Sequence, residues 1–85
     1  MIYRILFKPS AFKQGKKLPK KIQSKIREAI DKLKTEPRKI GCKKLRGTNN
    51  LYRVRVGDYR IVYEIEDDRL IILVLKIAHR KDIYR

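Results

Sequence analysis

The chain has 85 residues, which suits one small domain over residues 1–85. Its 24 lysines and arginines outnumber 9 aspartates and glutamates, and the net charge of +15 points to an anionic partner: nucleic acid first, an acidic protein second and a membrane surface last. The apolar runs are too short to cross a bilayer and no signal peptide is visible, so we expect no membrane partner. The lone Cys42 excludes an internal disulfide, which fits a cytoplasmic protein.

A strand and two helices are expected first. Residues 2–8 alternate between apolar and other side chains, and Pro9 ends that strand because proline has no N–H for a ladder. Ser10 is the expected N-cap of a short helix. Pro19 suits the first turn of a second helix, because its missing N–H costs nothing there. The apolar stripe of this second helix consists of Ile22, Ile26, Ala29, Ile30 and Leu33.

A hairpin is expected after a non-periodic segment. Pro37 ends the second helix, and residues 38–50 contain glycines and an Asn-Asn pair typical of a connecting loop. The next stretch, LYRVRVGDYRIVY, alternates on both sides of Gly57-Asp58. Glycine enters φ > 0 without steric cost, so these two residues favour a type II′ turn. One face of the hairpin is apolar and aromatic, whereas the other carries Arg53, Arg55 and Arg60.

The last predicted strand spans residues 70–78, after a second tight turn at residues 66–69. Its nearly continuous apolar sequence, LIILVLKIA, is typical of a central strand covered on both faces. We therefore predict an α+β fold in the order β-α-α-β-β-β, with a small, mostly antiparallel four-stranded sheet and a two-helix hairpin on one face. The first strand is expected to lie beside the last and parallel to it, which leaves the arginine face open.

Several kinds of functional site lack the residues that they need. One histidine and one cysteine cannot supply a metal centre, and no glycine-rich phosphate loop occurs, so we expect neither a metal nor a cofactor. A dyad of Cys42 and His79 lacks an evident group to orient it. The acidic residues near the second turn are interpreted as a solvated hairpin tip, and they are Glu64, Glu66, Asp67 and Asp68.

The arginines of the hairpin face are the remaining candidates for chemistry. A guanidinium binds phosphate through two parallel hydrogen bonds and keeps its proton, so it can stabilise charge but is a poor general base. Such a face suits RNA cleavage in which the 2′-hydroxyl attacks its neighbouring phosphate. Proton transfer would then fall to His79, Lys76 or Tyr84, or the chemistry would run mainly on electrostatics. The alternative is that exposed arginines only keep the chain soluble.

Three stretches carry a resemblance to a known family: KKLRG at residues 43–47, LYRVRVGDYRIVYEI at residues 51–65 and HRKDIYR at residues 79–85. Together they resemble the RelE/ParE toxin superfamily of bacterial and archaeal toxin–antitoxin systems, over essentially the whole chain. The resemblance implies a RelE-like toxin that cuts mRNA in the ribosomal A site without a metal. It also implies a cognate antitoxin, and the charge of the chain favours one with an acidic, amphipathic segment.

The resemblance also implies which residues act. RelE-like toxins have two basic residues two apart on the second strand, an arginine on the third, an arginine near the end of the fourth and a tyrosine near the C-terminus. The best-studied family pattern has lysines at the positions of Arg53 and Arg55, and one of those lysines is a candidate base. Arginine does not readily exchange a proton, so we add His79 as a candidate for proton transfer. The predicted catalytic set is Arg53, Arg55, Arg60, His79, Arg80 and Tyr84. The predicted RNA- and ribosome-binding set is Lys43, Lys44, Arg46, Lys76, Lys81 and Arg85.

The expected function is therefore that of a ribosome-dependent mRNA endoribonuclease toxin. Two alternatives stay open, because a fold does not determine a function. One is a ParE-like toxin that inhibits DNA gyrase, which would not need the arginine and tyrosine set. The other is a non-catalytic member that only binds nucleic acid.

Overall fold

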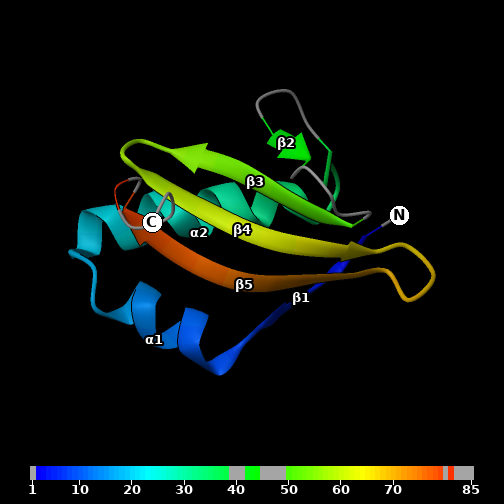
Figure 1. Cartoon of the computed structure of the whole chain (residues 1–85), viewed down its shortest axis with the longest axis horizontal. Helices are drawn as coiled ribbons and strands as arrows, with labels where there is room; N and C mark the ends of the chain where they lie inside the picture. The colour runs from blue at the N-terminus through cyan, green and yellow to red at the C-terminus, as the bar shows by residue number, and fades with distance from the viewer. Residues whose placement is uncertain (1, 39–41, 45–49, 80, 82–85) are drawn as a thin grey trace.

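The structure is a computed structural model and describes residues 2–38, 42–44, 50–79 and 81 (Figure 1). Its helices and strands are β1 (Arg4–Phe7), α1 (Pro9–Lys16), α2 (Lys20–Leu33), β2 (Cys42–Lys44), β3 (Leu51–Val56), β4 (Tyr59–Glu66) and β5 (Ile71–His79). These strands form one five-stranded sheet in the order β1-β5-β4-β3-β2. β1 runs parallel to β5, and the other neighbouring strands are antiparallel.

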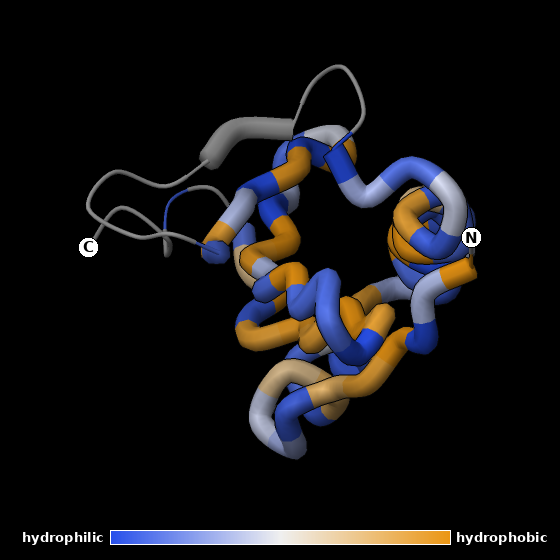
Figure 2. Tube along the Cα trace, turned by 90° about the vertical axis from the view of Figure 1, so that its right-hand side faces the viewer, coloured by the Kyte–Doolittle hydropathy of each residue, from blue (hydrophilic) through white to orange (hydrophobic). Residues whose placement is uncertain are grey.

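The predicted α+β architecture is confirmed. The four expected strands and both helices occur in the expected order, and β1 lies beside β5 in parallel. Both helices lie on one side of the sheet, where α1, α2, β1 and β5 together line a hollow of about 390 Å³. Figure 2 shows α2 nearly end-on at one side of the molecule, with hydrophobic residues recurring along the strands. The other side of the sheet carries no helix of the described chain.

A proline stands at the start of each helix, as the first residue of α1 and as the N-cap of α2. α1 starts at Pro9 with Lys8 as its N-cap, so the prediction that Ser10 caps this helix is wrong by two positions. Proline suits the first helical position because its missing N–H would find no partner within the helix. Pro19 is the N-cap of α2. α2 ends at Leu33, four residues before Pro37, so Pro37 does not end the helix directly.

The core lies between α2 and the sheet. Ile26, Ile30 and Leu33 are the buried residues of α2, and they belong to one hydrophobic cluster with Tyr63 and Ile72 from the sheet. The apolar stripe predicted for the second helix is therefore the stripe that faces the core. α1 adds Ala11 to this cluster and covers β5 beyond the end of β1, where the Gln14 Oε1 accepts a hydrogen bond from the Ile77 N–H at 3.0 Å.

The β3–β4 hairpin has the predicted turn. Gly57 adopts φ 60°, whereas Asp58 is not among the described residues with positive φ, as a type II′ turn requires. The second turn differs from the prediction, because residues 67–70 separate β4 from β5 and Leu70 has φ 53°. β5 accordingly begins at Ile71, one residue later than expected.

Two further predictions about the strands need correction. Residues 38–50 were expected to form only a loop, but Cys42–Lys44 pairs with β3 as the short edge strand β2. β5 was expected to be covered on both faces. Its helix side is buried at Ile72, Val74 and Ile77, but Leu73 is only half-buried.

Candidate nucleic-acid interface

The register of the strands divides the side chains of the sheet between two faces. Val54, Ile61 and Ile77 lie opposite one another on β3, β4 and β5, and all three are buried. Ile77 also lines the hollow beside the helices, so these residues mark the helix-covered face. Side chains alternate along a strand, so their neighbours point away from the helices. We call this second side the cationic face, and it carries Arg53, Arg55, Arg60 and Lys76.

These four cations of β3, β4 and β5 lie in two rows across the strands. In the first row Arg53 is opposite Val62, and Val62 is opposite Lys76. In the second row Arg55 is opposite Arg60, which is opposite Ala78. Like charges directly opposite each other destabilise a sheet, so the Arg55–Arg60 pair favours an anion between or above the two groups.

The guanidinium groups differ in their surroundings. Arg55 is exposed, and its Nε donates a hydrogen bond to the Gly57 carbonyl oxygen at 3.1 Å. Arg60 is only 9% exposed, so the expectation of an open arginine there is wrong. Its Nη1 donates to the Tyr59 carbonyl oxygen at 3.3 Å. Neither Arg55 nor Arg60 pairs with a carboxylate of the described residues, and each keeps N–H groups that an anion could bind.

His79 lies on the other face of the sheet. It is opposite Tyr59 in the register, and the two rings meet edge to face with centroids 5.4 Å apart. The His79 Nδ1 accepts a hydrogen bond from the Lys81 N–H at 3.3 Å, so its proton, when the ring is neutral, lies on Nε2. The structure therefore does not bring His79 together with the arginines, and its predicted part in proton transfer has no support from its position.

Two carboxylates, Glu64 and Glu66, lie on the cationic face, and the sequence interpretation missed the first of them. Glu64 belongs to β4, two residues after Val62, and stands opposite Leu51 and Leu73. It is therefore part of the sheet rather than of the second turn. The signal was present in the sequence, because Arg60, Val62 and Glu64 share one parity of the strand.

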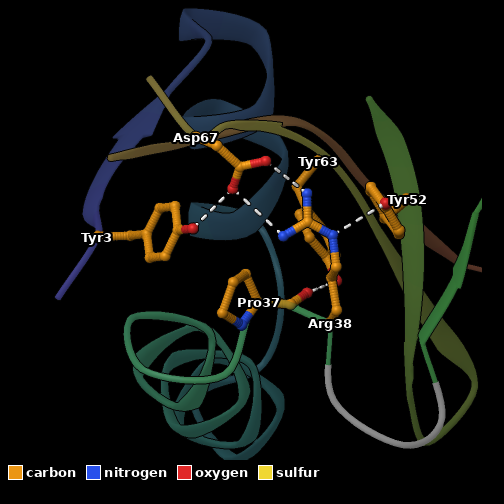
Figure 3. A network of polar contacts seen from close by, with 6 residues as sticks. All are labelled: Tyr3, Pro37, Arg38, Tyr52, Tyr63 and Asp67. Atoms are coloured by element: carbon orange, nitrogen blue, oxygen red, sulfur yellow. Dashed lines mark hydrogen bonds and ion pairs between the residues drawn. The ribbon is translucent and has the colours of Figure 1, made fainter. Parts of the chain in front are cut away.

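The second turn is held by a polar network instead of being only solvated (Figure 3). The Asp67 carboxylate accepts hydrogen bonds from both terminal nitrogens of Arg38 at 3.2 and 2.8 Å and from the Tyr3 hydroxyl at 2.7 Å. The Arg38 Nε donates to the Tyr52 hydroxyl at 3.1 Å. Beside this network the buried Tyr63 donates to the Pro37 carbonyl oxygen at 2.7 Å. Asp67 therefore links the residue before β1 to the segment after α2, and Arg38 extends this network to β3.

The same contacts shift the ionisation of the groups that make them. The hydrogen bond from Arg38, and then that from Tyr3, hold the pKa of Asp67 below its ordinary value. The pKa of Tyr3 is raised, mainly because its hydroxyl donates to Asp67. The pKa of Arg38 is raised as well, by its bond to Asp67 first and to Tyr52 second. The network is thus most favourable with Asp67 charged and Tyr3 neutral.

The other predicted site residues are placed only in part. Lys43 and Lys44 belong to β2, where Lys43 stands opposite Arg53 and Lys44 opposite Tyr52. Lys81 is exposed just beyond β5. The remaining predicted residues lie outside the described part of the chain, and they are Arg46, Arg80, Tyr84 and Arg85.

Within residues 2–38, 42–44, 50–79 and 81, no group of three histidine, cysteine, aspartate or glutamate side chains lies close enough together to hold a metal ion. In the same part of the chain, neither helix is long and apolar enough to cross a membrane.

Comparisons with known proteins agree on one family. The family model described as "ParE toxin of type II toxin-antitoxin system, parDE" matches residues 4–84. The curated toxin RelG of Mycobacterium tuberculosis is 34% identical, with 100% of this chain and 99% of that protein covered. The mRNA interferase RelE of Shigella flexneri is 26% identical, with 95% and 86% covered.

A solved structure has the same fold. The toxin chain in the crystal structure of the archaeal RelE–RelB complex from Pyrococcus horikoshii superimposes with a TM-score of 0.82 and 35% sequence identity, over 94% of this chain and 97% of that chain. Family model, relatives and solved structure therefore place this chain in the RelE/ParE superfamily, as a RelE-like toxin of a type II toxin–antitoxin system.

Proposed function

We propose that this toxin is a ribosome-dependent endoribonuclease that cuts mRNA on its cationic face. The observation that carries the proposal is the convergence of Arg53, Arg55, Arg60 and Lys76 on one helix-free side of the sheet. A relative is named an mRNA interferase, which supports the same reaction class. RNA fits such a surface because each nucleotide brings one phosphate to the array of cations.

The proposed reaction is an internal attack within the RNA. The 2′-oxygen attacks the adjacent phosphorus, the bond from phosphorus to the 5′-oxygen breaks, and a 2′,3′-cyclic phosphate and a 5′-hydroxyl result. Negative charge builds up on the phosphoryl oxygens in the transition state. Fixed guanidinium groups stabilise that charge without reorganising, and each such donor typically contributes about 10²–10³-fold to the rate. The proposed mechanism therefore needs no metal ion for charge stabilisation.

The predicted catalytic residues divide into two groups under this proposal. Arg53, Arg55 and Arg60 bind and stabilise the scissile phosphate. Arg80 and Tyr84 remain predictions of the family resemblance, as a further phosphate ligand and a ring that stacks on a base. A cognate antitoxin with an acidic, amphipathic segment is the proposed protein partner, because the similar archaeal toxin was solved in complex with RelB.

Expression of the toxin without antitoxin, followed by mapping of mRNA 5′ ends, tests the proposal. Wild-type protein should produce cuts within translated codons. Arg55→Ala removes an exposed guanidinium and should lower the cutting on the order of 10²-fold. Lys25→Ala is the matched control, because it removes one exposed cation from α2, on the helix side of the sheet, and should leave the cuts unchanged.

A second candidate is inhibition of DNA gyrase, which the family model's description as a ParE toxin favours. In that case expression would cause DNA damage while mRNA stays intact. Toxicity that Arg55→Ala does not relieve, with uncut mRNA, would contradict the ribonuclease proposal. Absence of any toxicity would instead support a non-catalytic, nucleic-acid-binding member.

A further inference from the structure

β5 contains one residue more than the stretch of β4 that it pairs with. Val62 is opposite Lys76 but Tyr63 is opposite Val74, so Leu75 has no partner and forms a β-bulge. Regular alternation from Val74 would turn Lys76 toward the helices, where its ammonium would be buried in the core. The bulge instead turns Lys76 outward, beside Val62, and returns Ile77 to the core, where it is 3% exposed.

The bulge therefore delivers a lysine to the arginine face. Lys76 is half-buried and makes no hydrogen bond or ion pair with the described residues, so no internal partner explains its place in the strand. Arg53 and Lys76 are two strands apart, or about 10 Å between their backbones. The short side chain of Val62 stands between them. Two long side chains that flank a short one can both reach a phosphodiester above Val62.

The proposed reaction still needs a proton donor, and a lysine can serve as one whereas the arginines cannot. The leaving 5′-oxygen must gain a proton, and a guanidinium does not release one. A lysine ammonium can give a proton to an alkoxide, which is a much stronger base. The carboxylates that the register of β4 places on this face are Glu64 and Glu66, and an ionised carboxylate has no proton to give. His79 is on the opposite face.

We propose that Lys76 is the general acid that protonates the leaving 5′-oxygen. This inference rests on the proposed ribonuclease function. The 2′-oxygen forms its bond to phosphorus while the bond from phosphorus to the 5′-oxygen breaks, and the electron pair of the broken bond takes a proton from Nζ of Lys76. The 2′-hydroxyl proton passes to solvent. The neutral Lys76 amine then takes up a proton from solvent, so the atoms and charges balance.

Lys76→Arg tests this role because it keeps the positive charge and removes the proton donor. The assay is single-turnover cleavage by purified toxin on ribosomes that carry an mRNA with one mapped cut site. The second substrate has sulfur in place of the bridging 5′-oxygen at that site, because a thiolate leaves without protonation. On the oxygen substrate Lys76→Arg should lower the cleavage rate on the order of 10²–10⁴-fold, with the half-saturating concentration unchanged. On the sulfur substrate its rate should approach that of wild type.

Lys25→Arg on α2 is the matched control and should cut both substrates like wild type. Equal cleavage of the oxygen substrate by Lys76→Arg and wild type overturns the inference while leaving the proposed function intact. An equal loss on both substrates also overturns it, since Lys76 would then serve only binding or structure. A wild-type protein that cuts neither substrate overturns the ribonuclease function, and the inference with it.

Discussion

Asp67 shows how much of this small domain depends on single side chains. It is an exposed turn residue, yet its carboxylate binds Tyr3, which directly precedes β1, and Arg38 from the segment after α2. The guanidinium of Arg38 also lies over the Tyr52 ring, 5.5 Å from its centroid, and Tyr52 stacks on the fully buried Tyr63. The turn is thereby connected to the core through two aromatic rings.

Asp67→Asn should lower the melting temperature at neutral pH, because it removes the charged acceptor of Arg38 and Tyr3. The pKa of Asp67 is depressed in the folded state, so its stabilisation is present above the unfolded-state pKa and is lost as pH falls through the lower, folded-state pKa. The difference in melting temperature between wild type and Asp67→Asn should therefore shrink in acid. Thermal unfolding followed by circular dichroism from pH 7 down to pH 2 measures it.

Asp68→Asn provides the control within the same turn. Asp68 is exposed and makes no hydrogen bond or ion pair with other described residues. Its substitution removes the same charge from the adjacent position and should change the melting temperature little. If both variants lose the same stability, the network around Asp67 is not the cause.

At the scale of elements, the β3–β4 hairpin sets the positions of three of the four cations. Its two-residue turn fixes the register that places Arg55 directly opposite Arg60. That register depends on Gly57 at φ 60°, a conformation that costs an ordinary L-residue about 1–2 kcal/mol. A β-carbon added at Gly57 would meet no heavy atom within 4 Å, so backbone strain is the whole steric effect of a substitution.

Gly57→Ala should accordingly destabilise the protein by about 1–2 kcal/mol. Gly57→Asn should cost less, because asparagine tolerates positive φ better than alanine. Urea unfolding of the two variants and wild type gives the comparison. Equal stability of Gly57→Ala and wild type would mean that the turn takes another conformation.

The hairpin was predictable from sequence because both of its signals are local. Alternation over residues 51–63 and a glycine at the first turn position suffice. β2 was not predictable, because Cys42–Lys44 is three residues long and has neither alternation nor β-branched residues. Such an edge strand forms because β3 offers it hydrogen bonds, which is a property of the fold rather than of the segment.

The sequence also could not predict to which face of the sheet each residue of β5 points. The run LIILVLKIA is apolar on both sides, so it does not reveal where alternation is interrupted. Only pairing with β4 shows the bulge at Leu75, and that bulge decides that Lys76 joins Arg53 while His79 meets Tyr59. The candidate arginines were thus predictable by parity, whereas the lysine and the histidine were not.

For the whole molecule, the excess of positive charge is spread over both sides of the sheet. No acidic residue precedes Glu28, so α1 and the first half of α2 are cationic as well. The net charge of +15 on a chain with a radius of gyration of 11.9 Å repels itself in the folded state. Three salt bridges join described residues, and none of them involves Arg55, Arg60 or Lys76.

The free toxin should therefore become more stable as salt is added. Raising NaCl from 20 to 500 mM screens the repulsion, and relief of about 1 kcal/mol would raise the melting temperature by about 4–8 °C in a domain of this size. Replacement of Lys20, Lys21 and Lys25 by glutamine lowers the net charge by three and should reduce this dependence on salt. A melting temperature that is independent of salt in both proteins would contradict the expectation.

The parallel pairing of β1 with β5 has a consequence for biosynthesis. β5 lies between β1 and β4 and supplies Lys76, yet it comes last in sequence among the described strands. β1 therefore has no neighbour in the sheet, and the cationic face lacks Lys76, until β5 has been synthesised. Because this pairing joins distant parts of the chain, it should form late in folding, and the proposed cleavage of mRNA should wait for it.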